Sequence, residues 1–96
     1  TDSVLDVGCG IGFGYNVFYD CAFTGIDTSE HHVDTAKNLF VGGGAEFNHS
    51  SIDEEEEGKT YDYVILSGIF NIGYDWKEVE ALCKTAYDKA RIGIGV

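Results

Sequence analysis

Two acidic residues and three alternating glycines give this chain its clearest chemistry. Asp6 stands two residues before Gly8, glycine recurs at Gly10 and Gly12, and Asp27 follows 19 residues after Gly8. Glycines at this spacing let the backbone turn sharply and approach a ligand closely. In an open α/β sheet, a carboxylate at the end of the second strand accepts hydrogen bonds from ribose hydroxyls. The pattern therefore predicts a loop that binds a nucleoside-like ligand.

The spacing of the glycines excludes the dinucleotide-binding fingerprint. The pattern G-x-G-x-x-G requires a glycine where Phe13 stands if it is counted from Gly8, and where Tyr15 stands if it is counted from Gly10. Asp6 would also repel a pyrophosphate at a helix start, whereas it suits a ligand with a positive charge or an amino group. The alternative for Asp6 is a bond to backbone amides of the turn.

Alternating strand and helix signals surround this loop. Apolar runs predict strands at residues 3–7, 22–26, 46–48, 63–66 and 91–96. Helices are predicted at residues 15–19, 30–40 and 76–90. Such alternation predicts an α/β fold, a doubly wound Rossmann-like parallel sheet with strand order 3-2-1-4-5 and helices on both faces. The ligand is expected at the switch point between the first and fourth strands.

The run at residues 4–12 resembles motif I of the class I S-adenosylmethionine-dependent methyltransferases. Residues 25–40, 47–53 and 61–71 extend the resemblance over nearly the whole chain, in order. It implies S-adenosylmethionine as cofactor and S-adenosylhomocysteine as product. The residues that the resemblance and the loop pattern assign to the cofactor are Asp6, Gly8, Cys9, Gly10, Gly12, Asp27, Thr28, Ile52, Asp53 and Ser67.

Three of these positions also have plain structural interpretations. Asp27 is expected at the ribose, but it could instead cap the following helix. By position in the family, Ile52 packs on adenine and Asp53 receives the adenine amino group. Ile52 could equally be ordinary core, and Asp53 opens an acidic run, residues 53–57, of the kind that is usually a solvated loop.

The reaction itself is less clearly marked. Ser67, Asn71 and Tyr74 are candidates near the reaction centre, with His49 more distant, and they match no recognised catalytic set. The chain has no proline, which argues against amino methylation of DNA bases, because that chemistry uses a proline-containing motif. The leading hypothesis is methyl transfer to an unidentified small-molecule or protein acceptor. The alternative is a cofactor-binding module without independent activity, a degenerate subunit or a fragment that needs a partner.

Composition narrows the partners. Six basic against 17 acidic residues give a net charge of −11, too few cations for a nucleic-acid-binding patch. No apolar stretch is long enough to cross a membrane. Three widely spaced cysteines do not suggest a disulfide framework, and free thiols suit a reducing, cytoplasmic location. No metal site is expected, because His31 and His32 are adjacent and cannot share a helix face.

The length predicts a single domain over residues 1–96 that lacks the usual sixth and seventh strands of the family. The apolar segment at residues 92–96 would then form an exposed sheet edge. We therefore expect a homo-oligomer or a partner subunit to pair with that edge.

Overall fold

A five-stranded parallel sheet forms the centre of the molecule. The computed structural model describes residues 2–55, 58–68 and 75–95. The strands are β1 (Ser3–Val7), β2 (Ala22–Asp27), β3 (Glu46–His49), β4 (Tyr61–Ile65) and β5 (Ala90–Gly95). Their order is β3-β2-β1-β4-β5, and every neighbouring pair is parallel. The predicted α/β fold and its strand order are confirmed. The described residues hold no sixth or seventh strand.

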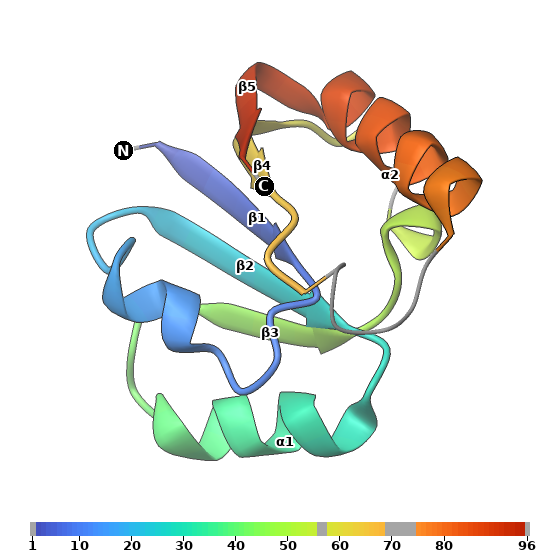
Figure 1. Ribbon diagram of the computed structural model, residues 1–96. Helices are drawn as coiled ribbons and strands as arrows, with labels where there is room; N and C mark the ends of the chain where they lie inside the picture. The colour runs from blue at the N-terminus through green and yellow to red at the C-terminus, as the bar shows by residue number, and fades with distance from the viewer. Residues whose placement is uncertain (1, 56–57, 69–74, 96) are drawn as a thin grey trace.

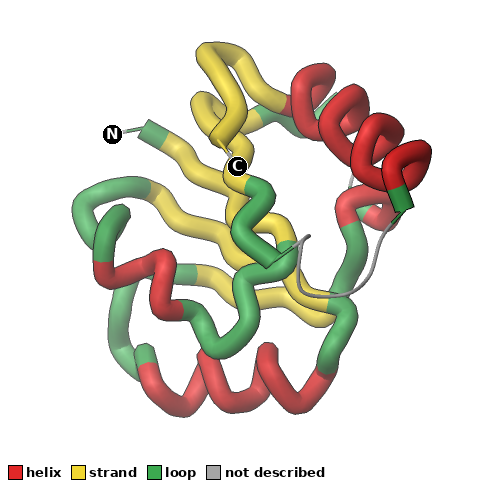
Figure 2. Tube along the Cα trace, viewed as in Figure 1, coloured by secondary structure: helices red, strands yellow, loops and turns green. Residues whose placement is uncertain are grey.

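Helical segments cover both faces of the sheet. They are the α-helices α1 (Glu30–Leu39) and α2 (Trp76–Lys89) and the short 3₁₀ segments η1 (Phe13–Asn16) and η2 (Ile52–Glu54). The element α1 lies on one side with η1, and α2 lies on the other side with η2 (Figure 1; Figure 2). This is the layered arrangement that parallel strands require, because each crossover must return over a face of the sheet.

Alternation along β1 divides the core into two clusters. Val4 packs toward α1 with Phe23 and Phe47, whereas Leu5 and Val7 face the α2 side. Burying side chains of this size contributes about 1.5–3 kcal/mol each to the free energy of unfolding. The two clusters hold β1 in the middle of the sheet. The glycine loop begins at the carboxyl end of this strand.

Each α-helix begins at a capping residue. The backbone amide of His32 donates to the side chain of Ser29 at the start of α1, over 3.3 Å. The amide of Glu78 donates to the carboxylate of Asp75 at the start of α2, over 2.9 Å. Both caps occupy amides that no helical carbonyl can reach. No helix among the described residues is long and apolar enough to cross a membrane.

Two predicted elements differ from the structure by more than one residue at an end. The helix expected at residues 15–19 is only the 3₁₀ segment η1, because Gly12 enters it in a left-handed conformation (φ 91°) and Tyr15 turns inward onto Phe23 and Phe40. So short a segment gains little helical stability of its own. The fourth strand begins at Tyr61 rather than at residue 63, since Tyr61 pairs with Ala90 on the neighbouring strand.

The amino ends of the strands are joined by an acid and a base. Asp62 on β4 accepts a hydrogen bond from the backbone amide of Ser3 on β1 over 2.9 Å. Its other oxygen lies 2.7 Å from a guanidinium nitrogen of Arg91 on β5. The hydrogen bonds from Ser3 and the guanidinium of Arg91 lower the pKa of Asp62. These contacts connect β1, β4 and β5 at the amino ends of the strands, the end of the sheet opposite the glycine loop.

Candidate functional site

Two glycines let the carboxyl ends of β1 and β4 approach each other. Gly8 follows β1 with a positive φ of 73°, and a Cβ at this position would lie 2.9 Å from the Cα of Gly68. A Cβ on Gly68 would collide with the carbonyl oxygen of Gly8. The amides of Gly8 and Cys9 both donate to the carbonyl of Ile26, over 2.9 and 3.0 Å. The backbones that follow β1 and β4 are therefore closely packed at the switch point, and Gly8 and Gly68 have no side chains to fill the space beside them.

Asp27 joins the glycine loop to the start of α1. One carboxylate oxygen accepts a hydrogen bond from the amide of Gly10 over 2.8 Å. The other accepts from the amide of Ser29, also over 2.8 Å. A carboxylate offers about four acceptor positions, so each oxygen keeps one for a ligand. Asp27 thus holds the turn before α1, whereas the cap of that helix is Ser29, and Asp27 also lines the cavity.

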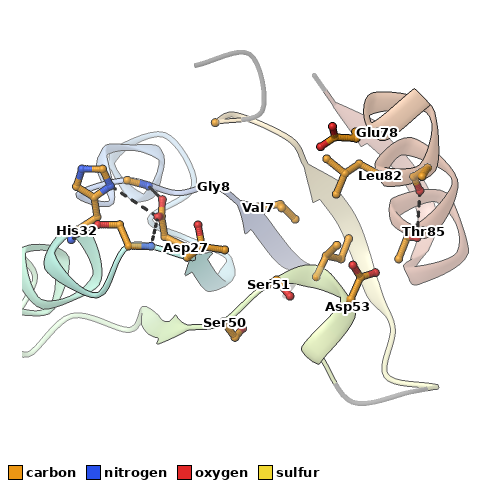
Figure 3. A pocket seen from close by; sticks show the side chains of 16 residues that line it. Val7, Gly8, Asp27, His32, Ser50, Ser51, Asp53, Glu78, Leu82 and Thr85 are labelled. Atoms are coloured by element: carbon orange, nitrogen blue, oxygen red, sulfur yellow. Dashed lines mark hydrogen bonds and ion pairs between the residues drawn. The ribbon is translucent and has the colours of Figure 1, made fainter. Parts of the chain in front are cut away.

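A cavity of about 420 Å³ opens beside Asp27, between the loop after β3 and one face of α2 (Figure 3). It is lined by Val7, Gly8, Gly10, Asp27, Thr28, Ser29, His32, Ser50, Ser51, Ile52, Asp53, Gly68, Glu78, Ala81, Leu82 and Thr85. Polar groups from β2 and α1 lie at one end, and Leu82 and Thr85 on α2 form the opposite wall. We call this space the first cavity. Its mixed lining suits a ligand with one polar and one flat apolar part.

A second cavity of about 300 Å³ lies on the Asp6 side of the glycine loop. It is lined by Asp6, Gly8, Cys9, Gly10, Ile11, Phe13, Gly14, Ser67 and Gly68. The two cavities share Gly8, Gly10 and Gly68, so they meet beside the carboxyl ends of β1 and β4. Neither lining contains lysine or arginine. A ligand that extends across the shared glycines would therefore meet carboxylates on both sides.

Asp6 is buried, with 2% of its surface exposed. Burial raises the pKa of its carboxyl to about 6, with a further rise from the charge of Asp27, while a hydrogen bond from Ser67 acts in the opposite direction. The Ser67 hydroxyl donates to one oxygen of Asp6. The other oxygen faces Gly14, where a Cβ would lie only 2.7 Å away. A buried acid without a cation beside it is a common feature of ligand-binding sites.

The expected cofactor residues separate into those that line a cavity and those that do not. Lining the first cavity are Gly8, Gly10, Asp27, Thr28, Ile52 and Asp53, and lining the second are Asp6, Gly8, Cys9, Gly10 and Ser67. Gly12 lines neither cavity. A Cβ there would lie 2.9 Å from the ring of Phe47, so Gly12 allows close packing in the core. Asn71 and Tyr74 lie outside the described residues.

Ile52 and Asp53 show why the loop after β3 was difficult to interpret. Ile52 reaches the first cavity but is 2% exposed and belongs to the core, so both interpretations apply to it. Asp53 is exposed at the rim of the cavity. The next two acids hold the loop in place. Glu54 accepts from the amide of Ser51 over 3.2 Å. Glu55 accepts from Ser50 over 3.2 Å and from the Tyr61 hydroxyl over 3.1 Å.

Sequence analysis missed the wall that α2 contributes. Glu78, Ala81, Leu82 and Thr85 line the first cavity from this helix. Their spacing of three, four and seven residues marks one helix face, but the same spacing is typical of core residues. Also missed were Val7, Ser29, His32, Ser50, Ser51 and Gly68, all of which except His32 lie at or shortly after the carboxyl end of a predicted strand. Proximity to a strand end was the available signal for these positions.

Comparison with known proteins agrees with this geometry. The family model described as a methyltransferase domain matches residues 4–93. No curated protein matches the chain. The plantazolicin methyltransferase BpumL, solved with a triazolic desmethylPZN analog and S-adenosylhomocysteine, is 30% identical with a TM-score of 0.58, over 68% of this chain and 26% of that one. The chain thus spans about a quarter of the length of that enzyme.

Two further structures cover more of the chain. A protein from Pyrococcus horikoshii OT3 is 27% identical with a TM-score of 0.73, over 86% of this chain and 41% of that one. Mycolic acid cyclopropane synthase CmaA1, solved with S-adenosylhomocysteine and CTAB, has a TM-score of 0.77 over 97% of this chain and 35% of its own. At 18% identity, this last match shows the fold alone. On the family match over residues 4–93, the chain belongs to the methyltransferase domain family.

Proposed function

We propose that this chain binds S-adenosylmethionine across the two cavities and belongs to an enzyme that transfers its methyl group. The observation that carries the proposal is the pair of carboxylates, Asp6 and Asp27, placed on either side of the glycine loop. The cofactor carries a sulfonium and an amino group, so its positive charges suit linings that contain acids and no lysine or arginine. The relatives solved with S-adenosylhomocysteine support the same ligand.

The two cavities would hold different parts of the ligand. The adenosine fits the first cavity, where Asp27 offers acceptors to ribose hydroxyls and Thr28 lies beside it. Ile52 and Asp53 lie at the far end of that cavity, as an adenine platform and an acceptor for the exocyclic amino group. The amino-acid part then crosses Gly8 and Gly10 into the second cavity, toward Asp6 and Ser67. Cys9 supports this loop from the core side, because its sulfur packs against Gly25.

Methyl transfer requires mainly that an acceptor be held in line with the methyl group. We propose a small-molecule or protein acceptor, since the cavities offer no cation for a polyanion. A base is needed only where the acceptor arrives protonated. Among the described residues Ser67 is the candidate for contact with the acceptor, and Asn71 and Tyr74 are candidates from the following segment.

A binding module without independent activity is the second candidate function. The observation that favours it is the engagement of Ser67, whose hydroxyl is already donated to Asp6. That leaves the described part of the site with residues for the cofactor and no free base beside the glycines that the two cavities share. A partner chain or a further segment would then supply the acceptor site.

Calorimetry with S-adenosylmethionine and S-adenosylhomocysteine tests both candidates. We expect dissociation constants well below about 1 mM, which corresponds to about 4 kcal/mol of binding free energy. The variant Asp27→Ala should lose about 1–3 kcal/mol, because charge-assisted hydrogen bonds to the ribose disappear. Asp34→Ala, on the exposed side of α1, is the matched control and should bind normally. If neither ligand binds, both candidates are wrong, and if both bind, a screen for methyl transfer decides between them.

We also propose that the open edge of β5 is covered by another polypeptide, from a second copy or a partner subunit. In the described sheet β5 pairs only with β4, and Ile92 on it is 62% exposed. Sedimentation should then show a concentration-dependent assembly, and a monomer across micromolar concentrations would contradict this.

A cytoplasmic location is proposed as well, because Cys9, Cys21 and Cys83 are free thiols.

A further inference from the structure

A histidine in the first turn of α1 lies beside the carboxylate of Asp27 at one end of the first cavity. His32 lines the cavity, and Figure 3 shows the edge of its imidazole turned toward Asp27. The Nδ1 atom of His32 lies 3.7 Å from Oδ1 of Asp27. The side chain of His32 is 49% exposed and that of Asp27 only 12%, so the pair stands at the cavity entrance with the acid beneath.

The two atoms are close to each other but too far apart for a direct hydrogen bond. A direct hydrogen bond between nitrogen and oxygen spans about 2.7–3.2 Å, and 3.7 Å exceeds that range. An oxygen atom placed about 2.8 Å from each of them fits between the two, as a bridging water or hydroxyl does in wider polar contacts. The pair therefore has the geometry of a slot for one hydroxyl group.

The hydrogen-bonding capacities on both sides of the slot suit a hydroxyl. Oδ1 of Asp27 already accepts the amide of Ser29 and keeps one acceptor position. The imidazole nitrogen can donate when it carries the ring proton. A hydroxyl can donate to the carboxylate and accept from the imidazole at the same time. A hydrogen or a methyl group at that place would leave the remaining acceptor position of Oδ1 and the imidazole nitrogen without this hydrogen bond.

The neighbouring histidine provides an internal contrast. His31 precedes His32 in the same turn, and the centroids of the two rings are 6.3 Å apart. His31 is exposed and does not line either cavity. Adjacent positions on a helix point about 100° apart, so the two side chains cannot serve the same site. Any effect on ligand binding should therefore belong to His32 alone.

We infer that Asp27 and His32 together hold one ribose hydroxyl of the adenosyl ligand, which makes His32 a residue that selects ribose over deoxyribose. This inference rests on the proposed function, because it places the adenosine in the first cavity. It adds a second partner, the imidazole of His32, to the carboxylate that the sequence pattern predicted. The ligand class it favours is a ribonucleoside in which the hydroxyl held by this pair is free.

The test compares adenosine, 2′-deoxyadenosine and 3′-deoxyadenosine under one set of buffer conditions. The wild-type chain should bind adenosine more tightly than one of the deoxynucleosides by about two- to ten-fold, the range of one hydrogen bond. In His32→Leu that preference should shrink by at least half, because only Asp27 still contacts the hydroxyl. His32→Asn should keep most of it, since the Asn amide nitrogen occupies the place of Nδ1. His31→Leu should match the wild type.

Two results would overturn the inference. One is a His32→Leu variant that weakens adenosine and both deoxynucleosides by the same factor, which would indicate a general packing role. The other is a His32→Leu variant with an unchanged preference. S-adenosylhomocysteine binding by the wild type separates the two levels. If it binds while the His32 variant keeps the preference, only the role of His32 is wrong. If neither it nor adenosine binds, the proposed function fails together with the inference.

Discussion

At the two ends of the sheet the pKa of a carboxylate is shifted in opposite directions. At the amino ends of the strands, Asp62 accepts hydrogen bonds from Ser3 and lies 2.7 Å from the guanidinium of Arg91, and these contacts lower its pKa. At the carboxyl ends, burial raises the pKa of Asp6 to about 6, and only the Ser67 hydroxyl partly offsets it. One acid is paired within the fold, and the other has no cation in its cavity lining.

The difference separates a residue that stabilises the fold from one that we propose contacts the ligand. A paired surface-proximal acid links β1, β4 and β5 and needs nothing else. A buried acid that is left charged at neutral pH costs free energy of folding, which a cationic ligand group would offset. The same division applies to glycine, because Gly68 touches the opposite backbone whereas Gly93 on β5 has open space beside its Cα.

The largest effect is expected at this glycine contact. In Gly68→Ala the added Cβ would collide with the carbonyl of Gly8, so β1 and β4 must separate at the switch point. We expect the free energy of unfolding to fall by about 2–3 kcal/mol, the usual cost of overpacking. Binding of S-adenosylhomocysteine should be lost. Urea denaturation and calorimetry measure the two quantities.

The matched control is Gly93→Ala, whose added Cβ meets no atom within 4 Å. It should leave the stability within about 0.5 kcal/mol of the wild type, as an ordinary surface substitution does. If both variants lose the same stability, the contact between Gly8 and Gly68 is not what distinguishes the carboxyl end of the sheet.

Exchanging each acid for its amide tests the comparison directly. Asp6→Asn should raise the free energy of unfolding at pH 7 by about 2 kcal/mol, because a buried charge disappears and the Ser67 hydroxyl keeps an acceptor. Its affinity for S-adenosylmethionine should fall by about ten-fold, since an ion pair with the ligand is lost. Asp62→Asn should lower stability and leave ligand affinity unchanged. A destabilised Asp6→Asn would show that Asp6 is structural.

Much of this division follows from the sequence, and the rest depends on contacts between distant segments. The strand order and the positions of Asp6 and Asp27 were predictable, because apolar strands that end in an acid and in glycines have few alternative interpretations. The role of Gly12 was not, since its contact is with the ring of Phe47, 35 positions further along the chain. Similarly, nothing local to residues 76–90 shows that Leu82 faces a cavity as well as the core.

The acidic run after β3 shows the same limit. A row of acids is usually solvated, which is correct for the exposed Asp53. Glu55 departs from that pattern because a buried tyrosine hydroxyl on β4 lies within reach of it. His32 was set aside as one member of an adjacent pair, although that pair divides into one residue in the cavity and one outside it. These roles depend on contacts with residues that are distant in sequence. The periodicity of the sequence does not indicate such contacts.

The two acids should also respond oppositely to pH. Asp6 has a folded pKa of about 6, above its unfolded value of 3.8, so its charge weakens the fold at pH 7. That penalty is relieved as pH falls through 6 toward 4, and the wild type should gain on Asp6→Asn in this range. Asp62 has a lowered folded pKa, so its stabilising contribution is present above the unfolded value and is lost on acidification. Denaturation at pH 7, 6 and 5 measures the first trend, and extension to pH 4 and 3 measures the second; parallel curves for wild type and Asp6→Asn would contradict the first.

The smallest expected effect lies between the two ends of the sheet, in the loop that Glu55 holds. Tyr61→Phe removes one hydroxyl and leaves the buried ring in place, so the free energy of unfolding should fall by only about 1 kcal/mol. Glu55 also binds Ser50, which lines the first cavity, so the loss should reach the ligand. We expect a two- to three-fold weaker affinity for adenosine, within the range of one hydrogen bond. Tyr63→Phe, on the same strand and exposed, is the control. If Tyr61→Phe loses stability without any change in adenosine affinity, the first cavity does not depend on this support, and its geometry is set at the carboxyl ends of the strands alone.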